Sequence, residues 1–258
     1  MRVPCSILVC VALVAAPAAA SATVRLRHVS LALGSARAVV DGTISPAIDV
    51  TARIVLGSAR LEVIARGSLA SLTARGSLHA AGIAVPFTAH ANLRAHRLDS
   101  FVANVLGAEV TLDPVTVALG RPTELAFHVR GLALARVLPA QLQATGTLDG
   151  ELAIRIDRDG ASLRAGTFCA RAPGRIRVTD TSWLPDGDGL KHRLAGTLAD
   201  FAYAQLAIDL APRGSDPDIR LAIRGHGAAI PQQLDLVVNL HGARDVAQRL
   251  IPRVWRSS

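Results

Sequence analysis

The sequence predicts an all-β protein: a long curled antiparallel sheet that forms an open apolar groove, with one to three short helices. From residue 24 onward, apolar side chains alternate with polar ones, and a period of two is that of a strand with one buried face. Turn pairs such as Asp41-Gly42 and Asp149-Gly150 interrupt these runs at short intervals, as hairpins require. The sequence has no strand–helix–strand rhythm, which argues against a parallel doubly wound sheet.

The chain begins with the features of an export signal. Arg2 precedes an apolar core from Ile7 to Ala16, and small residues follow up to Ala22. This order is typical of a secretory signal, and the apolar core is shorter than a membrane span normally needs. We therefore expect residues 1–22 to be a cleaved signal peptide, with a retained membrane anchor as the alternative.

The alternating runs follow one another along the rest of the chain. They cover residues 48–56, 61–69, 83–93, 125–129, 148–156, 206–210, 219–223 and 234–240. Arg66-Gly67-Ser68 and Arg75-Gly76-Ser77 recur nine residues apart, a weak repeat of the kind expected from a meander of similar strands. Short helices are predicted for residues 132–138, 189–198 and 245–255.

The one-sided strands predict the groove. Their apolar faces must be covered by a second sheet, by a curl of the same sheet, or by an apolar guest. Aromatic residues make up only 3% of the chain, so we expect a smooth aliphatic wall. Sixteen to twenty strands about 4.8 Å apart would give a groove of roughly 80–95 Å. The candidate lining residues are Ile83, Val85, Phe87, Leu125, Phe127, Val129, Leu152, Ile154, Ile156, Leu206, Ile208, Leu210, Ile219, Leu221, Ile223, Leu234, Leu236 and Val238.

Composition limits the partners. The net charge is +8, and nearly all the positive charge is arginine scattered along the chain. No basic run is interleaved with stacking aromatics, so nucleic acid is not an expected partner, whereas acidic lipid headgroups are. Cys5 and Cys10 lie in the predicted leader. We expect the remaining Cys169 to be a small buried hydrophobe rather than a reactive thiol.

No catalytic or metal-binding motif is present. The sequence lacks a G-x-S-x-G elbow, an H-E-x-x-H pair, a P-loop and a dinucleotide-binding glycine motif. His90 and His96 are the closest histidines, but no carboxylate or cysteine at ligand spacing completes a metal site. Polar strand positions explain His90 and His128. We therefore expect no enzyme activity, no catalytic residue, no metal and no cofactor.

An ordered series of short strings runs from Gly131 to Arg249. It comprises Gly131–Leu134, Ala144–Leu152, Ala172–Ile176 and Leu198–Tyr203, followed by strand-like residues 219–225 and 234–242. This series resembles the C-terminal domain of the YdbH family, also labelled a dicarboxylate transport domain. The family is related to the AsmA-like and TamB-like envelope proteins.

The resemblance implies a long curled β-sheet whose apolar groove carries phospholipid between the inner and outer membranes of a Gram-negative envelope. It implies a periplasmic location, or membrane association if the leader is retained. Its expected partners are phospholipid or another lipid, and a longer envelope bridge protein or a small outer-membrane lipoprotein. We expect three parts: the signal peptide at 1–22, an N-terminal β-meander at 23–120 and a YdbH-like β-domain at 121–258. The alternative is a non-enzymatic structural or protein-interaction sandwich of the envelope.

Overall fold

The computed structural model describes most of the chain after the predicted leader. The described residues are 23–33, 36–80, 82–117, 121–137, 142–157, 160–178, 196–197, 199–213, 216–227 and 230–240. The predicted signal peptide and the predicted helix at 245–255 lie outside them, as does most of the predicted helix at 189–198.

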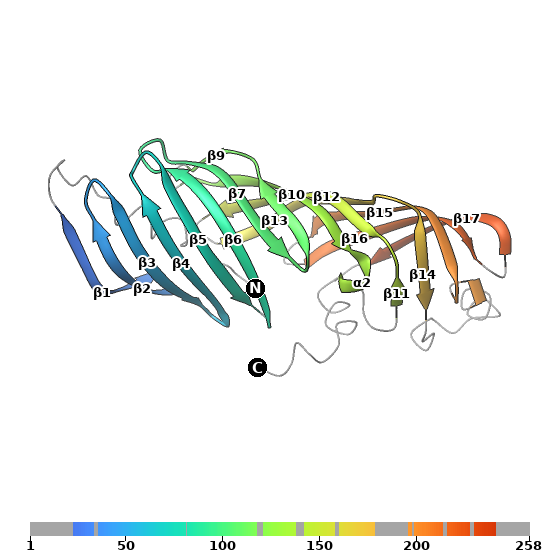
Figure 1. Ribbon diagram of the computed structural model, residues 1–258. Helices are drawn as coiled ribbons and strands as arrows, with labels where there is room; N and C mark the ends of the chain where they lie inside the picture. Colours follow the sequence, from blue (N-terminus) through green and yellow to red (C-terminus); the bar gives the residue numbers. More distant parts are fainter. Residues whose placement is uncertain are drawn as a thin grey trace.

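The described residues form one antiparallel sheet of seventeen strands (Figure 1). The first nine are β1 (Val24–Leu33), β2 (Ala36–Ile44), β3 (Ile48–Leu56), β4 (Ala59–Gly67), β5 (Leu72–Ala80), β6 (Ile83–Asn92), β7 (Arg97–Val105), β8 (Ala108–Leu112) and β9 (Val115–Thr116). The other eight are β10 (Thr123–Ala133), β11 (Leu142–Ala144), β12 (Thr147–Asp157), β13 (Gly160–Ala170), β14 (Gly174–Val178), β15 (Phe201–Arg213), β16 (Asp216–Gly227) and β17 (Ile230–Leu240). The predicted all-β fold is confirmed.

The predicted helix at 132–138 is present in shorter form. It is α2 (Leu134–Val137), a single turn that follows β10 directly. The helix is shorter than expected because Leu132 and Ala133 still pair with β12 as part of the ladder.

Fourteen strands stand side by side in one hydrogen-bonded succession. From β1 to β8 they follow chain order, and the succession continues through β10, β12, β13, β15, β16 and β17. At about 4.8 Å between strands the sheet is about 60 Å long, shorter than the predicted groove. The prediction was too long because β9, β11 and β14 extend existing rows and add no length: β9 pairs with β7, β11 with β14, and β14 with β15.

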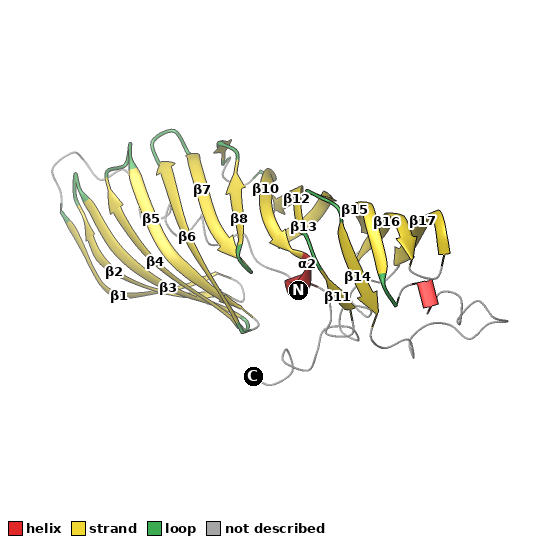
Figure 2. Ribbon diagram, turned by 45° about the vertical axis from the view of Figure 1, so that its right-hand side comes forward, coloured by secondary structure: helices red, strands yellow, loops and turns green. Residues whose placement is uncertain are grey.

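The sheet curls about its long axis and is not closed into a barrel (Figures 1 and 2). The ladder continues across the boundary predicted at residue 120, because β8 pairs with β10 from Leu112 and Phe127 onward. The division into two β-parts stays a prediction.

Alternation decides which face of each strand is apolar. In β4, Leu61, Val63 and Ala65 are buried, whereas the alternate residues Arg60 and Glu62 are exposed. The register aligns apolar positions across strands, because Leu61 lies opposite Leu78, and Leu78 lies opposite Val85. The concave face is therefore apolar and the convex face mostly polar.

The aromatic side chains depart from the expected aliphatic wall. All five phenylalanines and Tyr203 contribute to the apolar clusters or the cavity of the concave face. Phe101 stacks on Phe87 with ring centres 5.7 Å apart and meets Phe127 edge-on at 6.2 Å. Gly76 makes room for the Phe87 ring, since a Cβ there would lie 2.8 Å from it. The aromatic residues in the described part of the chain are thus concentrated on the concave face.

The expectation for Cys169 was wrong. Its side chain is exposed, because Cys169 lies opposite Asp149 and Ala207, at an outward position of β13. The neighbouring Phe168 takes the inward position and packs against the apolar cluster. Because its neighbours are also apolar, the sequence did not show which face of β13 Cys169 would occupy.

Candidate functional site

The concave face of β2 to β7 holds an apolar cavity. Its volume is about 300 Å³, at the lower end of the range of small-molecule sites. It is lined by Val40, Ile44, Ile48, Val50, Ala52, Ile54, Leu61, Val63, Ala65, Leu72, Ala74, Leu78, Val85, Phe87, Ala89, Ala91, Leu93, Leu98 and Phe101. Every one of these side chains is aliphatic or aromatic. The cavity therefore offers a ligand apolar contact and no charge.

Small side chains create the space. Ala65, Ala74 and Ala89 lie opposite one another on three adjacent strands, and all three line the cavity. A methyl group at each of these positions leaves depth that a leucine would fill. Larger side chains surround them, with Ile54 and Leu61 paired on one side and Phe101 opposite Ala89 on the other.

One corner of the C-terminal half of the concave face is filled by the protein itself. Leu134 and Tyr203 are each only 1% exposed, and Phe201 and Leu148 are also fully buried. They form one cluster with Ala144, Ile176, Leu206 and Ile223. The helix α2 places Leu134 over this cluster, and the Leu134 N–H donates to the Gly146 carbonyl at 3.1 Å.

Tyr203 connects this cluster to the short gap between strands β11 and β12. Its hydroxyl donates to the Thr145 carbonyl at 2.7 Å, in the gap between β11 and β12. Gly146 and Gly174 leave room for the hydroxyl, because a Cβ on either would lie within 2.4 Å of it. Burial raises the pKa of Tyr203 above its ordinary value of 10.0.

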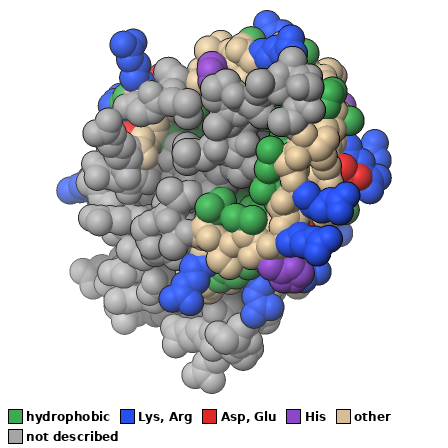
Figure 3. Space-filling model, turned by 90° about the vertical axis from the view of Figure 1, so that its left-hand side faces the viewer, with side chains coloured by type: hydrophobic (Ala, Val, Ile, Leu, Met, Phe, Trp, Pro, Cys, Tyr) green, Lys and Arg blue, Asp and Glu red, His purple; other side chains and the backbone are tan. Residues whose placement is uncertain are grey.

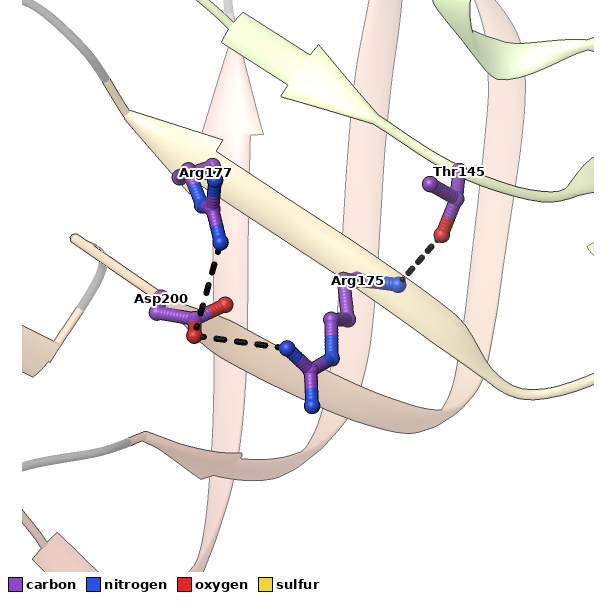
Figure 4. A network of polar contacts seen from close by, with 4 residues as sticks. All are labelled: Thr145, Arg175, Arg177 and Asp200. Carbon is purple, nitrogen blue, oxygen red and sulfur yellow. Dashed lines mark hydrogen bonds and ion pairs between the residues drawn. The ribbon is translucent and has the colours of Figure 1, made fainter.

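Polar contacts hold the same corner together (Figure 4). The Arg175 N–H donates to Thr145 Oγ1 at 2.9 Å. Asp200 Oδ2 lies 3.5 Å from Arg175 Nη1 and 3.8 Å from Arg177 Nη2. Thr145 lies in the gap between β11 and β12, Arg175 and Arg177 lie in β14, and Asp200 lies in the turn before β15. The corner is a structural joint, since Asp200 holds both arginines of β14 beside the turn that precedes β15.

A second polar joint lies at the bulge in β10. Asp149 Oδ1 accepts the Gly131 N–H at 2.7 Å, and Asp149 Oδ2 accepts from Arg171 Nε at 2.9 Å. The Gly131 N–H and the Arg171 guanidinium hold the pKa of Asp149 below its ordinary value. Gly131 has a φ of 74°, a conformation that glycine adopts without strain.

Eleven of the eighteen predicted lining residues fall into three groups. Val85 and Phe87 line the cavity. Leu125, Phe127 and Ile156 belong to a middle cluster with Leu98 and Leu112. The third group belongs to the filled C-terminal cluster or packs against it: Leu206, Ile208, Leu221, Ile223, Leu234 and Leu236.

The remaining candidates occupy the alternate positions of their strands that belong to the concave face. Val129 is buried, and Ile83, Leu152, Ile154, Leu210 and Ile219 are half-buried. Val238 lies opposite Leu221 in β17, but its side chain is outside the described part of the molecule. Their role in binding stays a prediction.

Most of the cavity lining was not among the predicted residues. Residues 48–56 and 61–69 were recognised as alternating runs, but their inward side chains were not chosen as lining. The signal that could have found them is the alanine at inward positions in neighbouring runs, such as Ala52, Ala65 and Ala74.

No metal site or membrane-spanning helix was found in the described residues. No group of three or more histidine, cysteine or acidic side chains is arranged there to hold a metal ion. None of the helices in that part of the chain is both long and apolar enough to cross a membrane.

Comparison with known proteins identifies the family. Residues 68–235, almost two thirds of the chain, match the family model YdbH-like, described as intermembrane phospholipid transport protein YdbH. No curated protein and no solved structure matches the chain significantly. The match begins well before the Gly131–Arg249 segment that carried the resemblance. The family is one of lipid transport in the cell envelope, not of enzymes, and the chain belongs to this YdbH-like family.

Proposed function

We propose that this protein is a periplasmic lipid-binding or lipid-transport module, which holds phospholipid acyl chains in its concave face on their way between the inner and outer membranes. The observation that carries the proposal is the wholly apolar cavity of β2 to β7. The family match supports phospholipid as the ligand class, and the predicted signal peptide supports the periplasm.

The energetics favour the chains over the headgroup as the recognised part. Keeping a methylene out of water is worth about 0.8 kcal/mol, so a chain of roughly sixteen carbons needs about 12 kcal/mol of shelter. Contiguous rows such as Ile54, Leu61, Leu78 and Val85 provide such shelter. No lining side chain hydrogen-bonds or carries charge. The headgroup would therefore lie outside the cavity, in water.

The two halves of the sheet would have different roles. The N-terminal half holds the apolar cavity, whereas Leu134, Phe201 and Tyr203 fill one corner of the C-terminal half. This filled corner favours the alternative, a structural or interaction role, for that part of the chain. We therefore place lipid in the N-terminal half and treat the C-terminal half as the scaffold.

The sheet edges suggest how a partner would join. In the described residues, β1 pairs only with β2 and β17 only with β16, so each outer edge presents free backbone groups. A longer envelope bridge protein or a small outer-membrane lipoprotein could extend the sheet there by strand addition.

The test is the lipid content of the purified protein. Native mass spectrometry and solvent extraction should find phospholipid bound to the wild-type chain. Protein that carries no lipid after purification, and takes none up from phospholipid vesicles, would refute the proposed function.

A further inference from the structure

The structure points to a membrane-docking surface on the convex face of β2 to β5, and we propose that it binds an anionic phospholipid bilayer. The surface begins with a row across four strands. Arg37 lies opposite Val55, Val55 opposite Arg60, and Arg60 opposite His79. All four side chains are exposed. We call these four residues the basic row.

The arginines of the basic row are not neutralised by neighbours. Other arginines on the same face of β3 and β4 are paired: Arg53 Nε lies 3.6 Å from Glu62 Oε1, and Arg66 Nε lies 3.2 Å from Asp49 Oδ1. Within the described residues, Arg37 and Arg60 have no such partner, and the row contains no acidic side chain. Its positive charge is therefore available to an outside anion.

Arginines on the other half of the sheet are mostly paired. Arg171 Nε is 2.9 Å from Asp149 Oδ2, and Arg224 Nε is 2.8 Å from Asp235 Oδ1. Further pairs involve Arg155, Arg164, Arg175, Arg177 and Arg213. Seen from the β1 end, basic side chains stand on the outside of the molecule with few acidic ones beside them (Figure 3). Among the described residues, arginines without an ion pair are thus more frequent toward that end.

Exposed aliphatic side chains share this face with the arginines. Val55 is 44% exposed, Val39 is 37% exposed and Ile64 is 46% exposed, although each belongs to a strand whose other face is buried. Ile64 lies opposite Arg75, another arginine for which the described residues provide no ion pair. Arginine beside aliphatic side chains suits a bilayer interface, where guanidinium groups bind phosphates and apolar groups enter the headgroup layer.

The position of this surface relates it to the cavity. Strands β2 to β5 carry the basic row on one face and Val40, Ile54, Leu61 and Leu78 of the cavity lining on the other. Docking there would leave only the thickness of the β-sheet between the cavity and the bilayer surface. The proposal goes beyond the proposed function and does not require lipid inside the cavity, because the docking contacts are all on the convex face.

The experiment is co-sedimentation of the purified chain with vesicles. Wild-type protein should bind vesicles that contain phosphatidylglycerol and not vesicles of phosphatidylcholine alone, at about 0.15 M ionic strength. Each arginine near an anionic surface is worth about 1 kcal/mol, or roughly fivefold. The double variant R37Q/R60Q should therefore bind roughly tenfold to thirtyfold more weakly.

A matched control separates this surface from total charge. R121Q/R220Q removes two exposed arginines that also have no ion pair among the described residues, from the segment before β10 and from β16. The control should bind vesicles like the wild type, and circular dichroism should show that both variants are folded. Equal loss in the two variants, equal binding to neutral vesicles, or no binding by wild-type protein would each overturn the proposal. Lipid retained in the cavity, measured separately by mass spectrometry, distinguishes these failures from failure of the proposed function.

Discussion

Filling the cavity from inside is the most direct test of the lipid site. Ala74 lies in the middle of the alanine row, between Ala65 and Ala89, and lines the cavity. The substitution Ala74→Phe would place a ring where the bound chain is proposed to lie. Because phenylalanine favours strands and the ring would replace the lipid as apolar filling, we expect the variant to fold.

The expected loss follows from the carbon atoms displaced. A ring of six carbons takes the place of about six methylene groups, and at about 0.8 kcal/mol each this removes about 5 kcal/mol of shelter. Relaxation of the chain into the rest of the trough will recover part of it. A loss of only about 1.4 kcal/mol already weakens binding tenfold, so we expect at least a tenfold reduction in lipid retention.

The assay compares lipid bound per protein by native mass spectrometry, together with displacement of a fluorescent phospholipid. The control is Ser77→Phe, which adds the same ring to the same strand at a position opposite Glu62 and Pro86, on the convex face. This control should retain lipid like the wild type. If Ala74→Phe keeps its lipid, or if both variants lose it equally, the chain does not lie in this cavity.

Three further predictions concern the filled corner of the sheet. Leu134→Ala should destabilise the protein by about 2–5 kcal/mol, measured as the denaturant midpoint, because Leu134 is almost fully buried; an unchanged midpoint would contradict the packing described. Tyr203→Phe removes the hydrogen bond to Thr145 and should cost about 1 kcal/mol. Because the folded pKa of Tyr203 is raised, wild-type stability should be complete below pH 10 and fall as the pH rises through the folded pKa. Tyr203→Phe should lack this alkaline loss, and parallel pH profiles of stability would refute it. Gly174→Ala should cost about 1–3 kcal/mol, since its Cβ would lie 2.6 Å from the Thr145 carbonyl oxygen, whereas Gly196→Ala, with open space around it, should leave the melting temperature unchanged.

Local alternation was enough to predict the all-β class and eight of the seventeen strands, with the inward face of each of these eight. In β4 the order Arg60, Leu61, Glu62, Val63 already separates an outward from an inward set, because successive side chains of a strand point to opposite faces. The open, one-sided sheet followed from the same pattern. Both depend only on neighbours in sequence.

Features that depend on contacts between residues distant in sequence could not be predicted from local alternation. The packing of the filled corner requires Tyr203 to meet Thr145, fifty-eight residues earlier. The length of the sheet depended on whether β11 and β14 add new rows or prolong old ones, which their pairing decides. The wrong expectation for Cys169 has a local cause, since Phe168-Cys169-Ala170 gives no polar residue to set the phase.

The strings that carried the family resemblance meet at the packed corner and not at the cavity. Ala144–Leu152 provides the Thr145 carbonyl and Gly146, Ala172–Ile176 provides Gly174 and Arg175, and Leu198–Tyr203 provides Asp200 and the tyrosine. Each of these positions has a specific steric or hydrogen-bonding task, so few residue types fit. The cavity is different, because any sequence that alternates and places small residues inward on adjacent strands would build it. A sequence signature can therefore identify the scaffold of such a protein while saying little about the width of its trough. That width, set by residues such as Ala65, Ala74 and Ala89, is where differences in the lipid held would arise.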